Sequence, residues 1–447
     1  MNSLIYGGPN PHLLNKLYDE KKIKVKFSIH SVDGAKKNLS NIDIVKNNLD
    51  INFEITDFGK SIYPNFYENN FNFFLNMFTR SHVNNQSYQE IKNHFAIFFH
   101  GFLDIIKKNK IELMIFFSLP HEGPDYILYK LAKSLKIKTI LMHQSIFPNK
   151  YFTVKDVEDL GKLDDNSPYS TNIEKNKLDG IQKLYTTTFK ARQLKLQNNQ
   201  IKNNTNKNLR KFILSILKKL KIIYRKDFEK SYLQNLGKVQ KKLNEILNIK
   251  KNRKIIFFPL HVQPELSTSL LGYNYDDQIL VLERLNNFAK NEWIVIAKEN
   301  PAQSSYQRGE FFFKRLKYLK NVYFCDRDED TEEIINHSDL ISTISGTIAI
   351  EGLLKSKKCL IFGNAWYKNL HGILKINEST TNEEINKFLN ITFDNKKFQN
   401  DLEKLLSCCD SGIVNEYDYF QLMTKNYDNE KNSTQVINNI NQFIDKN

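Results

Sequence analysis

Cysteine, glycine and proline are scarce in this chain of 447 residues, which contains 4 Cys, 16 Gly and 10 Pro. Four cysteines without metal-ligand spacing exclude the disulfide framework of a small secreted domain and favour a reducing, cytoplasmic compartment. So few glycines and prolines exclude a collagen-like chain and make long flexible linkers unexpected. No apolar run approaches the roughly 18 residues that span a bilayer. The first residues also lack the basic and then apolar pattern of a signal peptide, so we expect neither feature.

Basic residues outnumber acidic ones, with 65 Lys and Arg against 50 Asp and Glu and a formal net charge of +15. Hydrophobic residues make up 40% and charged residues 26%, which is ordinary for a globular protein and excludes a disordered chain. At about 100–200 residues per domain, the length predicts two or three domains, each with its own core. The positive excess favours an anionic partner, whether nucleic acid, anionic lipid or a phosphorylated substrate.

The first third of the chain alternates between predicted strands and helices. Residues 112–117 form a continuous apolar run that is typical of a buried parallel strand. A polar turn, a helical stretch at 125–135 and a second strand at 139–143 follow it. Strand, loop, helix and strand within about 30 residues form a βαβ unit. Shorter strands are predicted at 4–6, 24–30 and 53–56.

A similar pattern returns after a different middle section. Residues 173–253 are rich in Lys, Asn and Gln and have helical periodicity without convincing strands. Strands are then predicted at 254–259, 293–297, 322–325, 339–343 and 358–362, with a helix at 348–354. We therefore predict an α/β protein with an N-terminal domain at 1–172, a helical basic connector at 173–253, a second Rossmann-like domain at 254–378 and C-terminal helices at 379–447. Both domains are expected to be doubly wound and to face a cleft, with ligands at the carboxyl ends of the strands.

The first polar loop of the second domain directly follows the strand at 254–259. His261, Gln263 and Glu265 alternate in this loop, so an extended backbone would point all three side chains the same way. Three convergent groups exceed what helix capping requires and predict a binding site. The alternative is a polar loop that caps the next helix through one of the hydroxyl residues that follow.

Two more strands of this domain end in polar residues. Lys298 and Glu299 follow the strand at 293–297, where Lys298 would pair with a phosphate and Glu299 would accept hydrogen bonds from sugar hydroxyls. Ser345–Thr347 form a small-residue turn between a strand and a helix, where backbone N–H groups and hydroxyls suit an anion, and Glu351 would hold a ribose diol. The alternatives are a solvated strand end and a capped helix that packs on the sheet.

In the first domain, the loop after 112–117 contains His121, Glu122 and Asp125, and the next strand ends in His143. Because both strand ends belong to one edge of a sheet, the four side chains are expected at one site. A carboxylate there, Asp125 or Glu122, would act as nucleophile or base, assisted by the two histidines. The alternative is that Asp125 caps the following helix.

Two charged segments remain. Residues 209–226 are basic and amphipathic if helical, which suits an anionic membrane surface. The alternative is a connector helix whose Leu/Ile face packs on the domains. The acidic run at 326–330 is interpreted as a solvated turn, so no metal site is predicted.

Together, Pro259–Glu265, Lys298–Pro301 and Ser345–Glu351, followed by Phe362-Gly and Trp366-Tyr367, resemble the motifs of the capsule polysaccharide biosynthesis family, which includes bacterial Kdo transferases. The resemblance is strongest over residues 254–370 and weaker over 112–152. It implies a GT-B glycosyltransferase whose C-terminal domain binds a CMP-activated 2-keto sugar acid and whose N-terminal domain binds a polysaccharide or glycolipid acceptor. The donor-binding set would be His261, Gln263, Glu265, Lys298, Glu299, Asn300, Ser345, Gly346, Thr347 and Glu351.

The resemblance further implies transfer of Kdo or a related nonulosonic acid without a metal or other cofactor, because a single donor phosphate needs less neutralisation than a diphosphate. Family members commonly carry His-Pro where this chain has Asn300-Pro301, and an amide cannot carry the positive charge. This departure motivates two alternatives, a non-catalytic binding protein with a transferase-like fold and a transferase that uses another nucleotide sugar. Nucleic-acid binding is not favoured, since the basic residues concentrate in the connector without a known binding motif.

Overall fold

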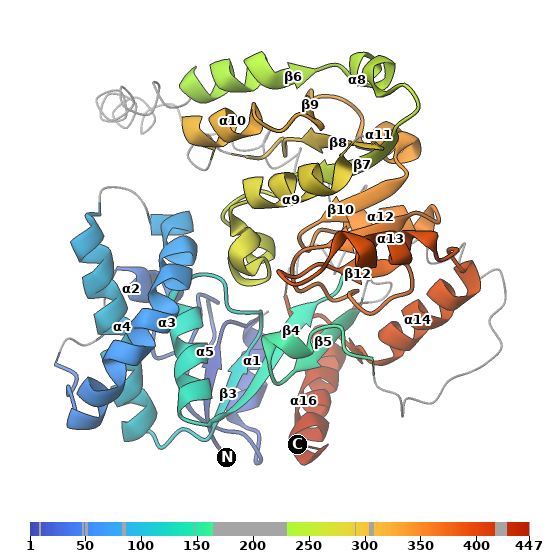
Figure 1. Cartoon of the computed structure of the whole chain (residues 1–447). Helices are drawn as coiled ribbons and strands as arrows, with labels where there is room; N and C mark the ends of the chain where they lie inside the picture. Colours follow the sequence, from blue (N-terminus) through green and yellow to red (C-terminus); the bar gives the residue numbers. More distant parts are fainter. Residues whose placement is uncertain are drawn as a thin grey trace, which may run out of the picture. The chain divides into compact units, whose positions relative to one another are not determined.

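The computed structural model describes residues 1–8, 10–46, 49, 52–82, 86–147, 149–163, 230–290, 292–303, 308–415 and 427–446 (Figure 1). The chain divides into unit 1, formed by Met1–Thr188 and Glu403–Asn447, and unit 2, formed by Phe189–Leu402. Of the predicted connector, residues 173–229 lie outside the described residues, and the basic segment 209–226 lies within this part.

Unit 1 is built on a sheet whose described strands run in the order β13-β5-β4-β3-β1-β2. The pairs β1–β2, β1–β3 and β3–β4 are parallel, whereas β5 pairs antiparallel with β4 and β13. β3 is buried along its whole length, which explains its uninterrupted apolar sequence. The strands are β1 (Asn2–Tyr6), β2 (Lys24–Ile29), β3 (Leu113–Phe116), β4 (Lys138–Gln144), β5 (Lys150–Val154) and β13 (Asp410–Ser411).

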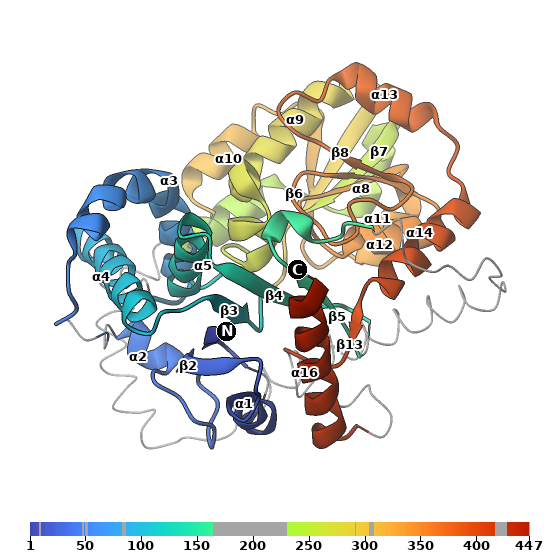
Figure 2. The same ribbon diagram turned by 90° about the horizontal axis from the view of Figure 1, so that it is seen from below.

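Helices cover both faces of this sheet. On one face, α1 and α16 lie side by side (Figure 2). Their apolar residues pack against Ile5, Ile115 and Ile140. On the other, Tyr129 of α5 meets Phe116 of β3, and α4 and α3 pack against α5. The helices are α1 (Pro11–Tyr18), α2 (Asn41–Val45), α3 (Asp57–His82), α4 (Tyr88–Lys108), α5 (Pro124–Ser134) and α16 (Asn429–Lys446), with a 3-10 turn, η1 (Val157–Asp159).

Unit 2 contains a sheet whose described strands are all parallel, in the order β12-β11-β10-β7-β8-β9-β6. β8 and β9 follow β7 on one side, and the chain then returns to place β10 on the other side of β7. The strands are β6 (Gln240–Lys241), β7 (Lys254–Pro259), β8 (Trp293–Lys298), β9 (Val322–Cys325), β10 (Leu340–Thr343), β11 (Lys358–Ile361) and β12 (Ile373–Lys375).

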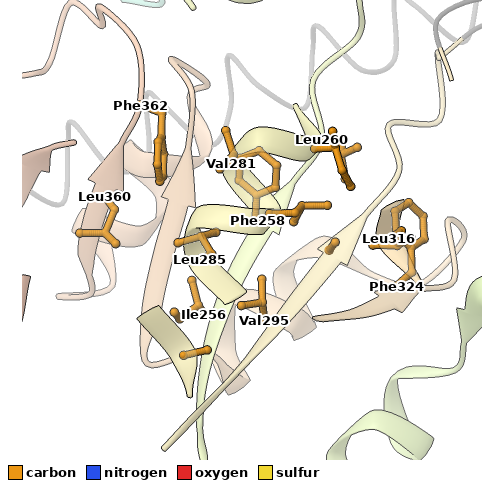
Figure 3. Close-up of a cluster of buried hydrophobic side chains, with 14 of the residues drawn as sticks. Ile256, Phe258, Leu260, Val281, Leu285, Val295, Leu316, Phe324, Leu360 and Phe362 are labelled. Carbon is orange, nitrogen blue, oxygen red and sulfur yellow. The ribbon is translucent and has the colours of Figure 1, made fainter. Parts of the chain in front are cut away.

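The main core of unit 2 lies between one face of this sheet and the helices α9 and α10. Figure 3 shows Ile256, Phe258 and Val295 of the strands packed against Val281 and Leu285 of α9. α11 and α12 contact the sheet through β7, β10 and β11. The helices are α8 (Leu243–Lys250), α9 (Ile279–Ala289), α10 (Glu310–Leu316), α11 (Thr331–His337), α12 (Ile348–Leu354), α13 (Asn382–Asn390) and α14 (Asn395–Ser407), and the shorter turns are η2 (Leu266–Leu270) and η3 (Tyr273–Asp276).

Two Rossmann-type α/β units, each on a largely parallel sheet, confirm the predicted fold class and the pair of units that a GT-B-like fold requires. The strand predicted at 53–56 is wrong, because these residues have no regular structure and lead into α3. Of the C-terminal helices predicted at 379–447, α13 belongs to unit 2 and α16 to unit 1. Among the described residues, no helix combines the length and apolar character needed to cross a membrane.

Candidate functional site

The strand order of unit 2 reverses between β7 and β10, which pair through Leu340–Ile256 and Ile341–Phe257. Ligands of open parallel sheets bind at the carboxyl ends of the strands beside such a reversal. Three loops leave the sheet at this edge, and we refer to them as the strand-end loops: 260–265 after β7, 299–303 after β8 and 344–347 after β10. All the donor-binding residues predicted from the sequence lie in or beside them.

His261 connects the first strand-end loop to the third. Its Nε2 lies 2.8 Å from Thr343 Oγ1 and accepts the N–H of Ile344 at 3.3 Å. Nε2 therefore carries no proton, and Nδ1–H donates to Ser267 Oγ at 3.3 Å. Burial, with the Arg308 charge as a second cause, lowers the pKa of His261 to about 4. The imidazole is thus neutral at pH 7 and holds two strand ends together.

Gly346 lies against this ring. A Cβ added to Gly346 would be 2.8 Å from His261 Cε1 and 2.9 Å from Thr343 Oγ1. The Gly346 N–H donates to Thr343 Oγ1 at 3.1 Å, and the Tyr367 hydroxyl donates to the Gly346 carbonyl. The close approach explains why glycine occupies the middle of this turn.

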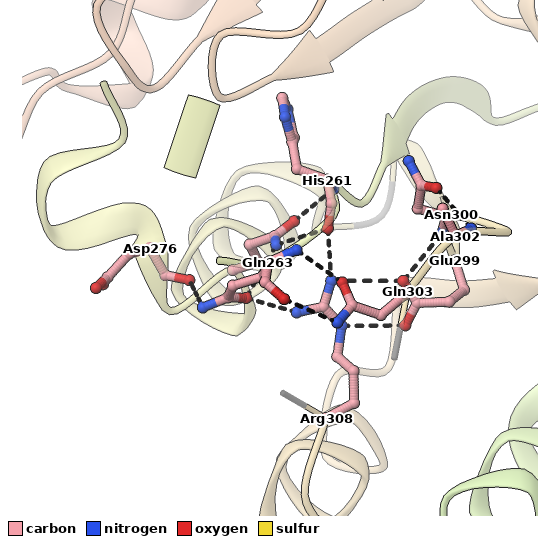
Figure 4. Close-up of polar contacts among 9 residues, drawn as sticks. His261, Gln263, Asp276, Glu299, Asn300, Ala302, Gln303 and Arg308 are labelled. Atoms are coloured by element: carbon pink, nitrogen blue, oxygen red, sulfur yellow. Dashed lines mark hydrogen bonds and ion pairs between the residues drawn. The ribbon is translucent and has the colours of Figure 1, made fainter. Parts of the chain in front are cut away.

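Arg308, which the sequence analysis did not identify, joins the first strand-end loop to the second (Figure 4). Its side chain donates to Glu299 through Nε at 3.0 Å and to Gln263 Oε1 through a terminal nitrogen at 2.6 Å. Its other terminal nitrogen donates to the His261 carbonyl at 2.9 Å. A single arginine ahead of a glycine has no sequence pattern that marks it, because its partners are distant along the chain.

The polar groups of Gln263 and Glu299 are engaged inside unit 2. Gln263 Oε1 accepts from Arg308 and from Gln278 Nε2, and its own Nε2 donates to the Asp276 carbonyl. Glu299 accepts from Arg308 and from the Asn300 N–H. These contacts give both side chains a positioning role, and direct binding of a donor by them stays a prediction.

Lys298 ends β8 with its side chain buried, at 6% exposure. Within the described part of the chain, its ammonium contacts only the Thr331 hydroxyl, at 3.3 Å. Burial lowers the pKa of Lys298, while the carboxylates of the 326–330 run act in the opposite direction. A buried ammonium with one weak hydroxyl partner can bind an anion strongly.

The remaining predicted donor residues lie around the loops. Asn300 Oδ1 accepts the N–H of Ala302 at 3.0 Å, so the carboxamide holds the turn through its oxygen. Ser345 Oγ donates to the Ser267 carbonyl at 2.9 Å, which uses its only hydrogen. Glu265, Thr347 and Glu351 are half-buried, Glu265 directly before η2 and the other two at the start of α12.

Asp125 of unit 1 has the contacts of a structural residue. It is 1% exposed, and its two carboxylate oxygens accept the N–H groups of His121, Glu122 and Tyr126 at 2.7, 2.8 and 2.7 Å. Burial raises its pKa, although these three N–H groups and His121 oppose the shift. Asp125 is the second residue of α5, whose N-cap is Gly123 without a side-chain cap, so it does not cap the helix as the alternative predicted. Its oxygens hold the loop before the helix, and its role as nucleophile stays a prediction.

The other predicted catalytic residues gather where the strand order of unit 1 reverses, between β1 and β3. His121 and Glu122 are half-buried in the loop after β3, and His143 is half-buried near the end of β4. Burial, with His121 as a second cause, lowers the pKa of His143 to about 4. Tyr6 ends β1 nearby, where burial and then Asp125 and Glu122 raise its pKa well above 10. Sequence reasoning missed Tyr6, because it ends a short strand without a polar neighbour pattern.

The described residues contain no group of three or more His, Cys, Asp or Glu that could hold a metal ion. Within the acidic run, Asp326 pairs with Lys242 at 2.6 Å and Asp330 caps α11. These contacts agree with the interpretation of the run as a turn.

Comparison with known proteins gives one family. No curated protein matches the chain. Among solved structures, KpsC of Thermosulfurimonas dismutans, beta Kdo 2,7 transferase, is 11% identical with a TM-score of 0.33, covering 78% of this chain and 96% of that one. The UDP-GlcNAc 2-epimerase of Methanocaldococcus jannaschii is 14% identical with a TM-score of 0.27, covering 91% and 99%. At these values, neither likeness transfers an activity or a residue role.

The family model described as "Capsule polysaccharide biosynthesis protein" matches residues 172–406. This match spans more than half of the 447 residues and includes all three strand-end loops. The motifs that carried the resemblance in the sequence lie within it, except those of the first domain. The chain therefore belongs to the capsule polysaccharide biosynthesis family.

Proposed function

We propose that this protein is a glycosyltransferase of capsule polysaccharide assembly that transfers Kdo or a related nonulosonic acid from its CMP-activated form. Family membership supports the assignment to capsule synthesis. The observation that carries the donor site is the His261–Thr343 contact, which brings the loops after β7 and β10 together at the strand reversal. The buried ammonium of Lys298 ends β8, next to β7.

In this proposal, each donor residue has a role that its chemistry suits. Lys298 binds the phosphate as a point charge, and the Nδ2 of Asn300 offers a neutral donor beside it. The N–H groups of Ile344 and Gly346 already donate to His261 and Thr343, so they shape the 344–347 loop. The Thr347 hydroxyl binds the nucleotide with Glu351 on the ribose, and Glu265 faces the sugar. Ser345 and Gly346 shape this loop, as His261, Gln263 and Glu299 shape the others.

The reaction breaks the bond between the anomeric carbon and the phosphate oxygen, so that CMP leaves with the electron pair. An acceptor hydroxyl forms the new bond and loses its proton to a base. The cation of Lys298 stabilises the departing phosphate without a metal, because CMP carries only one phosphate. We assign this base to Glu122, assisted by His121 and His143, with Asp125 holding their loop. The acceptor would be a polysaccharide or glycolipid reached from the cytoplasmic face of the inner membrane.

The test is a donor screen with purified protein and CMP-sugars, read as release of CMP, together with calorimetric titration of CMP. We expect Lys298→Ala and Glu265→Ala to abolish release while both variants stay folded by circular dichroism. Lys355→Ala is the control, since Lys355 pairs with Glu332 at 3.0 Å on α11 and should keep wild-type release. Wild-type turnover in both site variants would remove the donor-site assignment.

The same titration decides between a transferase and the non-catalytic alternative. A protein that shows no affinity for CMP or for another nucleotide would be a non-catalytic binding or scaffolding protein with a transferase-like fold. A protein that prefers another nucleotide would be a transferase with a different donor, for which the neutral side chain of Asn300 is the specific motive.

A further inference from the structure

The guanidinium of Arg308 is a charge held deep inside unit 2. The residue is 2% exposed, and its cation lies 5.3 Å from the ring centre of Phe312. Its ion pair with Glu299 joins two side chains that are 1% and 0% exposed. An arginine buried this fully is rare unless it is paired, and this one uses Nε and both terminal nitrogens (Figure 4).

The partners of Arg308 come from two strand-end loops. The His261 carbonyl and the Gln263 amide oxygen belong to the loop after β7, whereas Glu299 begins the loop after β8. Gln303 adds a second link between these loops, since its Oε1 accepts the Gln263 N–H at 2.9 Å and its Nε2 donates to the Gln263 carbonyl at 3.1 Å. The rigid fork of Arg308 therefore fixes the separation of the two loops.

The third strand-end loop is held through His261. Arg308 binds the backbone carbonyl of His261, and the ring of the same residue contacts Thr343 and the Ile344 N–H. A change in the position of the first loop must move this ring, and with it the packing of Gly346. One guanidinium thus influences all three loops that the proposed function uses.

The known energetics of buried ion pairs indicate that the Arg308–Glu299 pair positions the strand-end loops more than it stabilises the fold. Taking two charges out of water is costly, and apolar replacement of both partners of a buried pair is often neutral. Removing only one partner is strongly destabilising, because it leaves an unpaired charge. Since Glu299 neutralises Arg308, the guanidinium is also not available to a phosphate, unlike Lys298.

We propose that Arg308 is a positioning residue, which holds the strand-end loops in the arrangement that binds the nucleotide donor. The identity of the ligand, a nucleotide donor, rests on the proposed function. The effect of Arg308 on the arrangement of the strand-end loops does not. Arg308 itself touches no substrate in this scheme, and it acts through His261, Gln263 and Glu299.

The test removes both charges together, in the double variant Glu299→Gln, Arg308→Met. We expect this variant to unfold at nearly the wild-type urea midpoint, with loosened strand-end loops. Amide hydrogen exchange at Ile344 and Gly346 should be faster without any ligand. If the arrangement of the strand-end loops that binds CMP falls to about a tenth of the population, CMP affinity should fall about tenfold.

A matched control uses a second arginine–glutamate pair of unit 2. Arg315 binds Glu283 through two nitrogens, at 2.8 and 2.7 Å, between α10 and α9. The double variant Glu283→Gln, Arg315→Met should leave both exchange and CMP affinity unchanged. The conservative variant Arg308→Lys should keep the charge but lose the fork, and should give an intermediate affinity.

Two outcomes separate the inference from the proposed function. Unchanged exchange and unchanged CMP affinity in the Glu299→Gln, Arg308→Met variant would overturn the positioning role of Arg308. A wild-type protein that binds no CMP would defeat the proposed function, while the exchange measurement would still decide the inference. A single Arg308→Met variant is not used, because the unpaired Glu299 would be expected to unfold it.

Discussion

At a single residue, Lys298, anion binding and the stability of the folded chain make opposite demands on the buried ammonium. Its lowered pKa means that the folded chain holds the proton less tightly than the unfolded chain. Protonated Lys298 therefore costs stability at pH 7, and stability is recovered as the pH rises through the folded pKa toward the ordinary value of 10.5. A bound anion would remove this cost by pairing the charge.

We expect Lys298→Met to unfold at a higher urea concentration than the wild type at pH 7, because its free energy of unfolding should be higher by on the order of 1 kcal/mol. The variant should bind no CMP. The difference should shrink as the pH approaches 10. Lys357→Met is the control, because burial lowers the pKa of Lys357 too, yet its ammonium donates to the carbonyls of Asn336 and Ser338. That variant should lose stability, and a loss in Lys298→Met as well would contradict the argument.

At the scale of elements, the turn between β10 and α12 depends on one close contact. In Gly346→Ala, the added Cβ would meet the His261 ring and Thr343 Oγ1 at less than 3.0 Å, and neither can move freely. We expect a loss of roughly 1–3 kcal/mol in unfolding free energy and weaker CMP binding by calorimetry. Gly237→Ala is the control, since a Cβ there meets nothing within 4 Å and the residue is helical. The control should be neutral or stabilising by up to about 1 kcal/mol.

Sequence patterns predict a strand or helix well where the residues that become buried are close together in the sequence. The apolar runs at 254–259 and 322–325 coincide with β7 and β9, and the helix at 348–354 coincides with α12. The positions of the three strand-end loops followed from these strands. α3 and α4 were not predicted, although the buried residues Ile91, Phe95, Phe99 and Phe102 of α4 follow the helical spacing that a sequence shows. Their aromatic residues pack on each other, as Phe66 of α3 does on Phe99 of α4 at 4.9 Å.

The contacts that organise the candidate site could not be predicted from the sequence. Arg308 meets His261 across 47 positions, and His261 meets Thr343 across 82. No local pattern encodes such pairs, because only the finished sheet brings the strand ends together. Lys298 was predicted correctly to lie at a strand end, but its burial depends on neighbours that come later in the chain.

At the scale of the whole molecule, the chain ends in the unit where it began. α16 packs its Val436, Ile437 and Ile440 into the core of unit 1, beside the apolar residues of α1. Glu430 at its start pairs with His12 and Lys16 of α1, and Asp445 near its end pairs with Lys22 at 2.7 Å. Because unit 2 precedes α16 in the chain, α16 can join the core of unit 1 only after unit 2 has been synthesised.

Truncation after Tyr427 tests this dependence. Each buried aliphatic side chain contributes about 1.5–3 kcal/mol, so the loss of three approaches the whole stability of a typical domain. We expect calorimetry of the truncated chain to lose the unfolding transition of unit 1 and to keep that of unit 2, with CMP binding retained because the proposed donor residues all lie in unit 2. Removal of Lys446 and Asn447 alone should leave both transitions in place, since the apolar contacts of α16 precede them. If the longer truncation left unit 1 folded, the core would have to be complete without α16, contrary to the burial of its three aliphatic residues.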